Sequence, residues 1–217
     1  MFTRFVLLVL VSVFSAVPGV GLAQESAKQL SVQALKECEL GRRANERSVR
    51  LAHFEKGQAL AERALAANDQ YADAHFALFC TLGEQLRIDG ENLTSVLGFR
   101  RILRELDRTL ELAPDHLDAL SSKGTLLVRL PFMLGGDADK GEQMLRYVVQ
   151  RDPTAVSARL TLAKIYAARG NQMEALTLAT EALQNAQAER RTDLIPEAQA
   201  TLAELRSAHS VSRSVSP

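Results

Sequence analysis

Tryptophan is absent from the sequence, aromatic residues are few, and neither sign of charge is in excess. The 26 lysines and arginines balance the 26 aspartates and glutamates, which argues against nucleic acid as the main partner because phosphate binding needs a basic surplus. The local basic runs Arg42-Arg43 and Arg100-Arg101 have glutamates at helical spacing. We interpret these runs as solvated helix faces.

Motifs of catalysis and of metal binding are also missing. The histidines His53, His75, His116 and His209 form no His-x-x-x-His pair, and the sequence has no Gly-x-Ser-x-Gly elbow or glycine-rich dinucleotide loop. We therefore expect a non-enzymatic protein that uses no cofactor and no metal. The enzyme alternative would require a cluster of perturbed titratable groups around His53 or His75.

Residues 1–23 have the pattern of a secretory signal peptide. Arg4 precedes an apolar run from Phe5 to Val17, the helix breakers Pro18-Gly19 follow, and small residues precede a cleavage point after Ala23. The run is too short for a permanent membrane span, although an uncleaved anchor is the alternative. No cysteine stands at the cleavage point, which argues against a lipid anchor. We expect export, to the periplasm in a bacterium, and no stable membrane span after cleavage.

The remaining sequence contains helix–turn–helix units. In residues 153–187, Leu162, Ala163 and Tyr166 share one helix face, Gly170-Asn171 break the pattern, and a second set of small residues follows. Similar junctions turn at Asp69, Pro114 and Pro153, where proline fixes φ and ends the preceding helix. We predict clear repeats over residues 72–113, 117–152 and 156–186, an atypical first hairpin over 25–67, a capping helix over 193–209 and a disordered tail over 210–217.

This spacing resembles the tetratricopeptide repeat (TPR), a helical hairpin of about 34 residues. The resemblance covers roughly residues 52–187. It implies an all-α, right-handed solenoid over residues 24–209, in which the first helix of each hairpin lines a concave groove. The segments "HFEKGQALAERALAANDQYADAHFAL" and "LPFMLGGDADKGEQML" are also similar to TPR proteins with an L-G-G-D loop, such as exported bacterial proteins related to the TPR component of TRAP-type transporters and the animal regulators of microtubule dynamics.

The TPR resemblance implies a set of groove residues on the first helices of the hairpins. They offer a mixture of charged, polar and apolar contacts, suited to a peptide or protein partner rather than to a metal or nucleotide. The alternative is that they coat a solvated channel. The residues are Phe76, Glu84, Ser121, Thr125, Arg129, Leu160 and Lys164.

The longer interval within the third hairpin places an inserted loop at residues 130–141. Gly135-Gly136 permit a tight reversal, Asp137 is placed to cap the next helix, and Phe132 is one of three consecutive apolar loop residues. This loop is either a structural connector or a recognition element.

Two cysteines, Cys38 and Cys80, fall on the first helices of neighbouring hairpins, and such helices stack side by side in a TPR solenoid. An even number of cysteines permits a disulfide in an oxidising compartment. The alternative is that each is a small buried apolar residue. Without clustered histidines the pair gives no indication of a metal site.

The sequence thus predicts a binding or adaptor protein of the cell envelope that holds a peptide or protein through its concave groove. The alternative is an accessory component of a periplasmic transporter that binds a small ligand. That alternative would require a closed apolar cavity near Phe76, Phe79, Phe99 and Phe132.

Overall fold

The computed structural model describes residues 18–89 and 95–215, and every regular element in these ranges is helical. The all-α fold class predicted from the sequence is therefore confirmed. The helices are α1 (Pro18–Arg43), α2 (Arg47–Ala67), α3 (Ala72–Asp89), α4 (Ser95–Leu112), α5 (Leu117–Arg129), the 3-10 turn η1 (Phe132–Leu134), α6 (Ala138–Arg151), α7 (Val156–Ala168), α8 (Gln172–Ala188) and α9 (Ile195–Val215).

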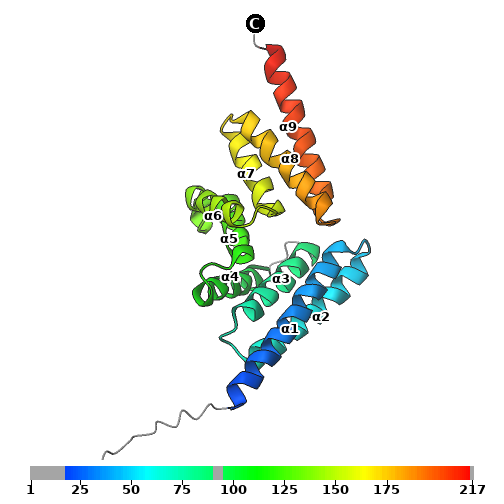
Figure 1. Cartoon of the computed structure of the whole chain (residues 1–217), viewed down its shortest axis with the longest axis vertical. Coiled ribbons are helices and arrows are strands. Elements are labelled where there is room, and N and C mark those ends of the chain that lie inside the picture. Colours follow the sequence, from blue (N-terminus) through cyan, green and yellow to red (C-terminus); the bar gives the residue numbers. More distant parts are fainter. Residues whose placement is uncertain (1–17, 90–94, 216–217) are drawn as a thin grey trace, which may run out of the picture.

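Successive helices pack in pairs, and the pairs stack along the chain (Figure 1). Helix α1 packs on α2, α3 on α4, α5 on α6 and α7 on α8, while α9 packs on α8 without a second helix of its own. The odd-numbered helices adjoin one another, since α1 also contacts α3, and α7 contacts both α5 and α9. They form the inner side of a curved stack, whose two halves face each other in Figure 1.

Small residues allow the two helices of a pair to pack closely. Ala175, Ala179 and Ala182 of α8 are fully buried against α7 and α9. In the third hairpin Gly124 of α5 lies against Gly141 of α6, where an added Cβ on Gly141 would stand 2.7 Å from the Gly124 carbonyl oxygen. Glycine at position 141 thus allows backbone contact between α5 and α6.

The ends of the helical region differ from the predicted boundaries. Pro18 and Gly19 lie within α1, whose described part runs from Pro18 to Arg43. Helix α9 continues to Val215, through most of the stretch predicted to be a disordered tail. Residues 1–17, which hold the apolar run of the predicted signal peptide, lie outside the described residues. Within residues 18–89 and 95–215 no helix is long and apolar enough to cross a membrane.

Candidate functional site: the concave groove

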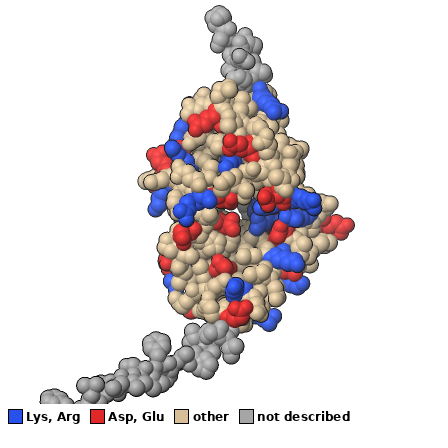
Figure 2. Space-filling model, viewed as in Figure 1, with Lys and Arg blue, Asp and Glu red and all other residues tan. Residues whose placement is uncertain are grey.

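Charged side chains from all five odd-numbered helices meet on the inner side of the stack. We call this set the charged seam. It consists of Arg42 on α1, Glu84 and Arg87 on α3, Arg129 on α5, Lys164 on α7 and Glu197 on α9. Figure 2 shows a hollow between the two halves of the molecule, with acidic and basic side chains at its borders.

Glu197 of α9 is approached by basic side chains from two other helices, α5 and α7. Its Oε1 accepts a hydrogen bond from Lys164 Nζ at 2.8 Å and lies 4.0 Å from Arg129 Nη2. Burial alone would raise the pKa of Glu197, but the hydrogen bond from Lys164 lowers it below the ordinary value. The charges of Arg129 and Arg87 act in the same direction. Because Arg87 belongs to α3, the two halves of the stack are in electrostatic contact across the groove.

The other end of the seam joins α1 to α3. Arg42 Nε lies 3.4 Å from Glu84 Oε1, and Arg87 Nη1 lies 3.5 Å from the same oxygen. Glu84 is largely buried, and its Oε2 has no hydrogen-bond partner within the described chain. Glu84 therefore helps to hold two groove arginines in place and is itself little exposed to a partner.

The two ends of the stack approach each other at Asp193, in the turn before α9. Arg191 donates two hydrogen bonds to the Asp193 carboxylate, at 3.0 and 2.9 Å, and Arg43 of α1 lies 4.0 Å from it. Burial by itself raises the pKa of Asp193, yet the paired Arg191 lowers it overall. This contact brings the first hairpin close to the turn before α9.

Two of the predicted groove residues, Phe76 and Leu160, do not line the groove in the structure. Phe76 is buried, stacked on Phe79 at 5.7 Å and tilted against the His116 ring at 4.7 Å between centroids. Leu160 is 2% exposed in the core between α7 and α8. Their prediction as exposed apolar contacts is therefore wrong, because the faces they occupy are covered by neighbouring helices.

Apart from the buried Glu84, the remaining predicted residues lie closer to solvent. Ser121 and Thr125 on α5 are half-buried, and the Thr125 hydroxyl lies 3.3 Å from that of Thr161 on α7. Arg129 and Lys164 are exposed. The groove is thus lined by polar and charged groups, and Glu197, which the sequence did not single out, stands at its centre. Its place on the capping helix, outside the recognised repeats, explains why no repeat register could indicate it.

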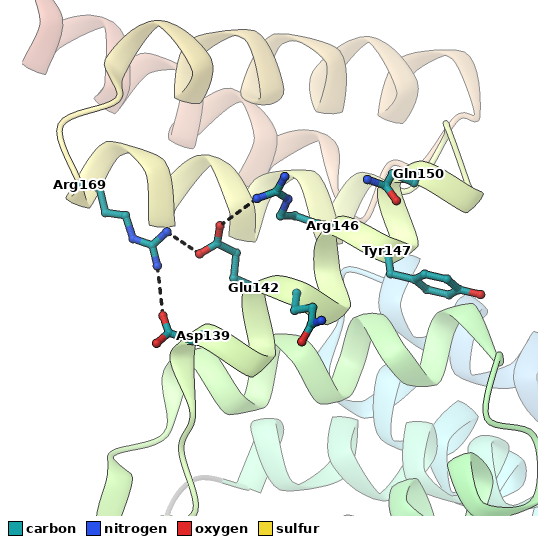
Figure 3. Close-up of a pocket in the computed structure, with 7 residues that line it drawn as sticks. Asp139, Glu142, Arg146, Tyr147, Gln150 and Arg169 are labelled. Atoms are coloured by element: carbon teal, nitrogen blue, oxygen red, sulfur yellow. Dashed lines mark ion pairs between the residues drawn. The ribbon is translucent and has the colours of Figure 1, made fainter.

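A shallow depression of about 460 Å³ lies between α6 and the end of α7 (Figure 3). Glu142 of α6 lies between Arg169, at 2.5 Å, and Arg146, at 3.9 Å, while Asp139 is 3.6 Å from Arg169. Tyr147 lies toward the other end of the depression in Figure 3. The charged groups here neutralise one another and tie α6 to the end of α7, so the depression offers no surplus charge to a ligand.

The inserted loop between α5 and α6 presents its apolar residues to solvent. Phe132 and Met133 are 90% and 93% exposed. Gly135 takes the left-handed conformation with φ 86°, and a Cβ on Gly136 would meet the Leu130 carbonyl oxygen at 1.8 Å. As predicted, the Asp137 side chain caps α6, accepting a hydrogen bond from the Lys140 amide at 3.0 Å. Phe132 lies in solvent and Phe76 lies in the core, so these two residues do not line one closed cavity.

Cys38 and Cys80 are joined by a disulfide, with Cα atoms 6.5 Å apart. Both cysteines are also buried, so they form a disulfide and occupy buried positions at the same time. Three of the four histidines make structural contacts: His53 with Glu37, His75 with Glu105, and His116 as the N-cap of α5. Among the described residues no group of His, Cys, Asp and Glu side chains could hold a metal ion.

Comparison with known proteins finds similarity at the level of structure. No family model and no curated protein sequence matches the chain. It is similar to TTC0263, a thermophilic TPR protein of Thermus thermophilus, with 16% identity and a TM-score of 0.49 over 85% of this chain and 99% of that chain. It is also similar to YrrB, a TPR protein with an unusual peptide-binding site, with 19% identity and a TM-score of 0.35 over 67% of this chain and 84% of that chain.

Proposed function

We propose that the chain is a non-enzymatic adaptor that binds a peptide or protein segment through its concave groove. The observation that carries this proposal is the charged seam, in which five helices place four basic and two acidic side chains on one inner surface. Electrostatic complementarity of this kind mainly supplies specificity and a fast association rate. The surplus of positive charge favours a segment that carries acidic groups.

Lys164 and Arg129 are the principal contacts in this proposal. Both are exposed, and both now share the single carboxylate of Glu197. A partner carboxylate entering the groove can take one of these cations without leaving a buried charge unpaired, because the pairs are partly solvated. Binding in the cell envelope is a separate part of the proposal, and it rests on the signal-peptide pattern of residues 1–23.

Affinity capture from a native envelope extract, read by mass spectrometry, tests the adaptor function. The double variant Arg129→Glu/Lys164→Glu should lose a stoichiometric partner, and its thermal midpoint should fall only modestly, because the two new carboxylates beside Glu197 are exposed to solvent. The matched control is Lys140→Glu/Arg151→Glu, which makes the same charge change on the exposed surface of α6. Equal capture by wild type and both variants would exclude the groove as the binding surface.

A further inference from the structure

A distinct cluster surrounds the disulfide that joins α1 to α3. On one side the sulfur atoms pack against an apolar core formed by Phe54, with Leu35 and Ile88 packed against it. On the other side lies the guanidinium group of Arg42, which belongs to the charged seam. The two sulfurs are thus placed between a low-dielectric core and a cation.

The guanidinium group of Arg42 contacts both sulfur atoms of the disulfide. Its Nη2 lies 2.7 Å from Cys80 Sγ and 3.4 Å from Cys38 Sγ. A disulfide sulfur is neutral and accepts hydrogen bonds weakly, so the oxidised form gains little from this contact. A thiolate gains much more, because charge-assisted hydrogen bonds are about twice as strong as neutral ones. The guanidinium therefore stabilises a thiolate relative to the disulfide, and it acts against the opposing effects of the apolar core and of the Glu84 carboxylate.

Arg42 is held over the sulfurs by a fixed partner. Glu84 follows Cys80 by one helical turn on α3, and its Oε1 lies 3.4 Å from Arg42 Nε. The Glu84 carboxylate is largely buried, which restricts its movement and hence that of the guanidinium. The Arg42–Glu84 ion pair involves neither sulfur atom, so breaking the S–S bond does not by itself remove it.

We propose that Cys38–Cys80 is a redox-active disulfide that undergoes thiol–disulfide exchange with a thiol or dithiol reductant, and that Arg42 stabilises the thiolates formed. A reductant thiol loses its proton to water and attacks Cys80 Sγ, which is 7% exposed, whereas Cys38 is fully buried. The S–S bond breaks, and its electron pair leaves with Cys38 Sγ as a thiolate next to Arg42.

A second reductant thiolate completes the reaction. It attacks the reductant sulfur of the mixed disulfide, which releases Cys80 as a thiolate and the reductant as its own disulfide. The protein disulfide gains two electrons, and two reductant thiols are oxidised. Reduction removes the covalent link between α1 and α3, two inner helices of the stack. This reaction is independent of the partner that the groove binds.

The test is the reduction equilibrium of the purified full chain in buffers of reduced and oxidised dithiothreitol, with thiols trapped by alkylation and counted by mass. Arg42→Gln should lower the equilibrium constant for reduction about tenfold at pH 7, because a charge-assisted contact to the thiolates is lost. Arg42→Lys keeps the positive charge and should restore part of the effect. The control Arg43→Gln should match wild type, because Arg43 pairs with Glu39 and Asp193 and has no contact with the sulfurs.

A second measurement gives the thiol pKa directly. The rate at which the reduced protein is alkylated as a function of pH should show a pKa below the ordinary value of about 8.5 in wild type and a higher one in Arg42→Gln. Equal reduction constants in wild type and Arg42→Gln would overturn the proposal. So would a disulfide that is reduced only after unfolding. If Arg42→Gln does not fold, an ordinary thiol pKa in the wild-type protein decides against it.

Discussion

His75 has both ring nitrogens in contact with acceptors. Nδ1 lies 2.7 Å from Glu105 Oε2, and Nε2 lies 2.9 Å from the Asp69 carbonyl oxygen. A neutral imidazole has only one N–H, so both contacts are hydrogen bonds only when His75 is protonated. Burial alone lowers the pKa of His75, but the bonds to Glu105 and Asp69 raise it overall. His75 thus joins α3 to α4 as an ion pair with Glu105.

The raised pKa of His75 predicts a pH-dependent stability. Its contribution is fully present below the unfolded pKa of about 6.5 and is lost as the pH rises through the higher folded value. Thermal midpoints measured from pH 5.5 to 8.5 should therefore fall more steeply for wild type than for His75→Gln, which cannot titrate. Parallel profiles for the two proteins would show that the pair contributes nothing to stability.

Substitution by alanine should have opposite effects on stability at two helical glycines. Gly141→Ala should destabilise the chain by about 1–3 kcal/mol, because the new Cβ would meet the Gly124 carbonyl oxygen and Val128 and push α5 from α6. Gly83→Ala should stabilise it by about 0.5–1 kcal/mol, because nothing lies within 4 Å and alanine favours the helix. Urea unfolding measures both changes. If Gly141→Ala proves as harmless as Gly83→Ala, the two helices are not in backbone contact.

At the scale of the elements, the loop between α5 and α6 has two parts. The backbone at its glycines is closely packed, and its apolar tip is exposed to solvent. Phe132→Ser/Met133→Ser should change the free energy of unfolding by no more than about 0.5 kcal/mol, since both side chains are in solvent. Gly136→Ala in the same loop should cost about 2 kcal/mol, because the backbone must move away from Leu130. Urea unfolding of the two variants decides. A large loss from the serine pair would mean that the tip packs into the fold.

The positions of the helices follow closely from local features of the sequence. Proline at 114 and 153 separates successive hairpins, and the predicted second to fourth hairpins coincide with α3–α4, α5–α6 and α7–α8 to within a few residues. The cap at Asp137 was equally predictable, because an aspartate after paired glycines satisfies the free N–H groups of a helix start. These signals act within a few residues and do not depend on tertiary structure.

The faces of the helices were harder to predict than their positions. Helix α7 carries apolar or small side chains around most of its surface, so its sequence has no polar stripe to mark the groove side. In the stack it is enclosed by α5, α6, α8 and α9, which leaves a narrow exposed band that includes Lys164 but not Leu160. A helix covered on several sides gives little periodicity from which to assign its exposed face.

For the whole molecule, the groove is defined by contacts between residues far apart in the sequence. Glu197 of α9 meets Lys164 and Arg129, and Asp193 meets Arg43 of the first hairpin. Such pairings depend on the curvature of the entire stack, which accumulates over small rotations between hairpins. They could not be derived from any one repeat, and they are the reason that the groove has a charged rather than an apolar lining.

Hydrogen–deuterium exchange of the chain, alone and with its captured partner, tests the assignment of the groove most directly. The account predicts added protection on the exposed inner surface of α5, α7 and the first turns of α9, around Arg129, Lys164 and Glu197, with α6 and α8 unchanged. Because bound segments shield the backbone that they cover, the location of the protected peptides identifies the binding surface. Protection confined to α6, α8 or the loop at Phe132 would contradict the groove assignment and place the partner on the outer side of the stack.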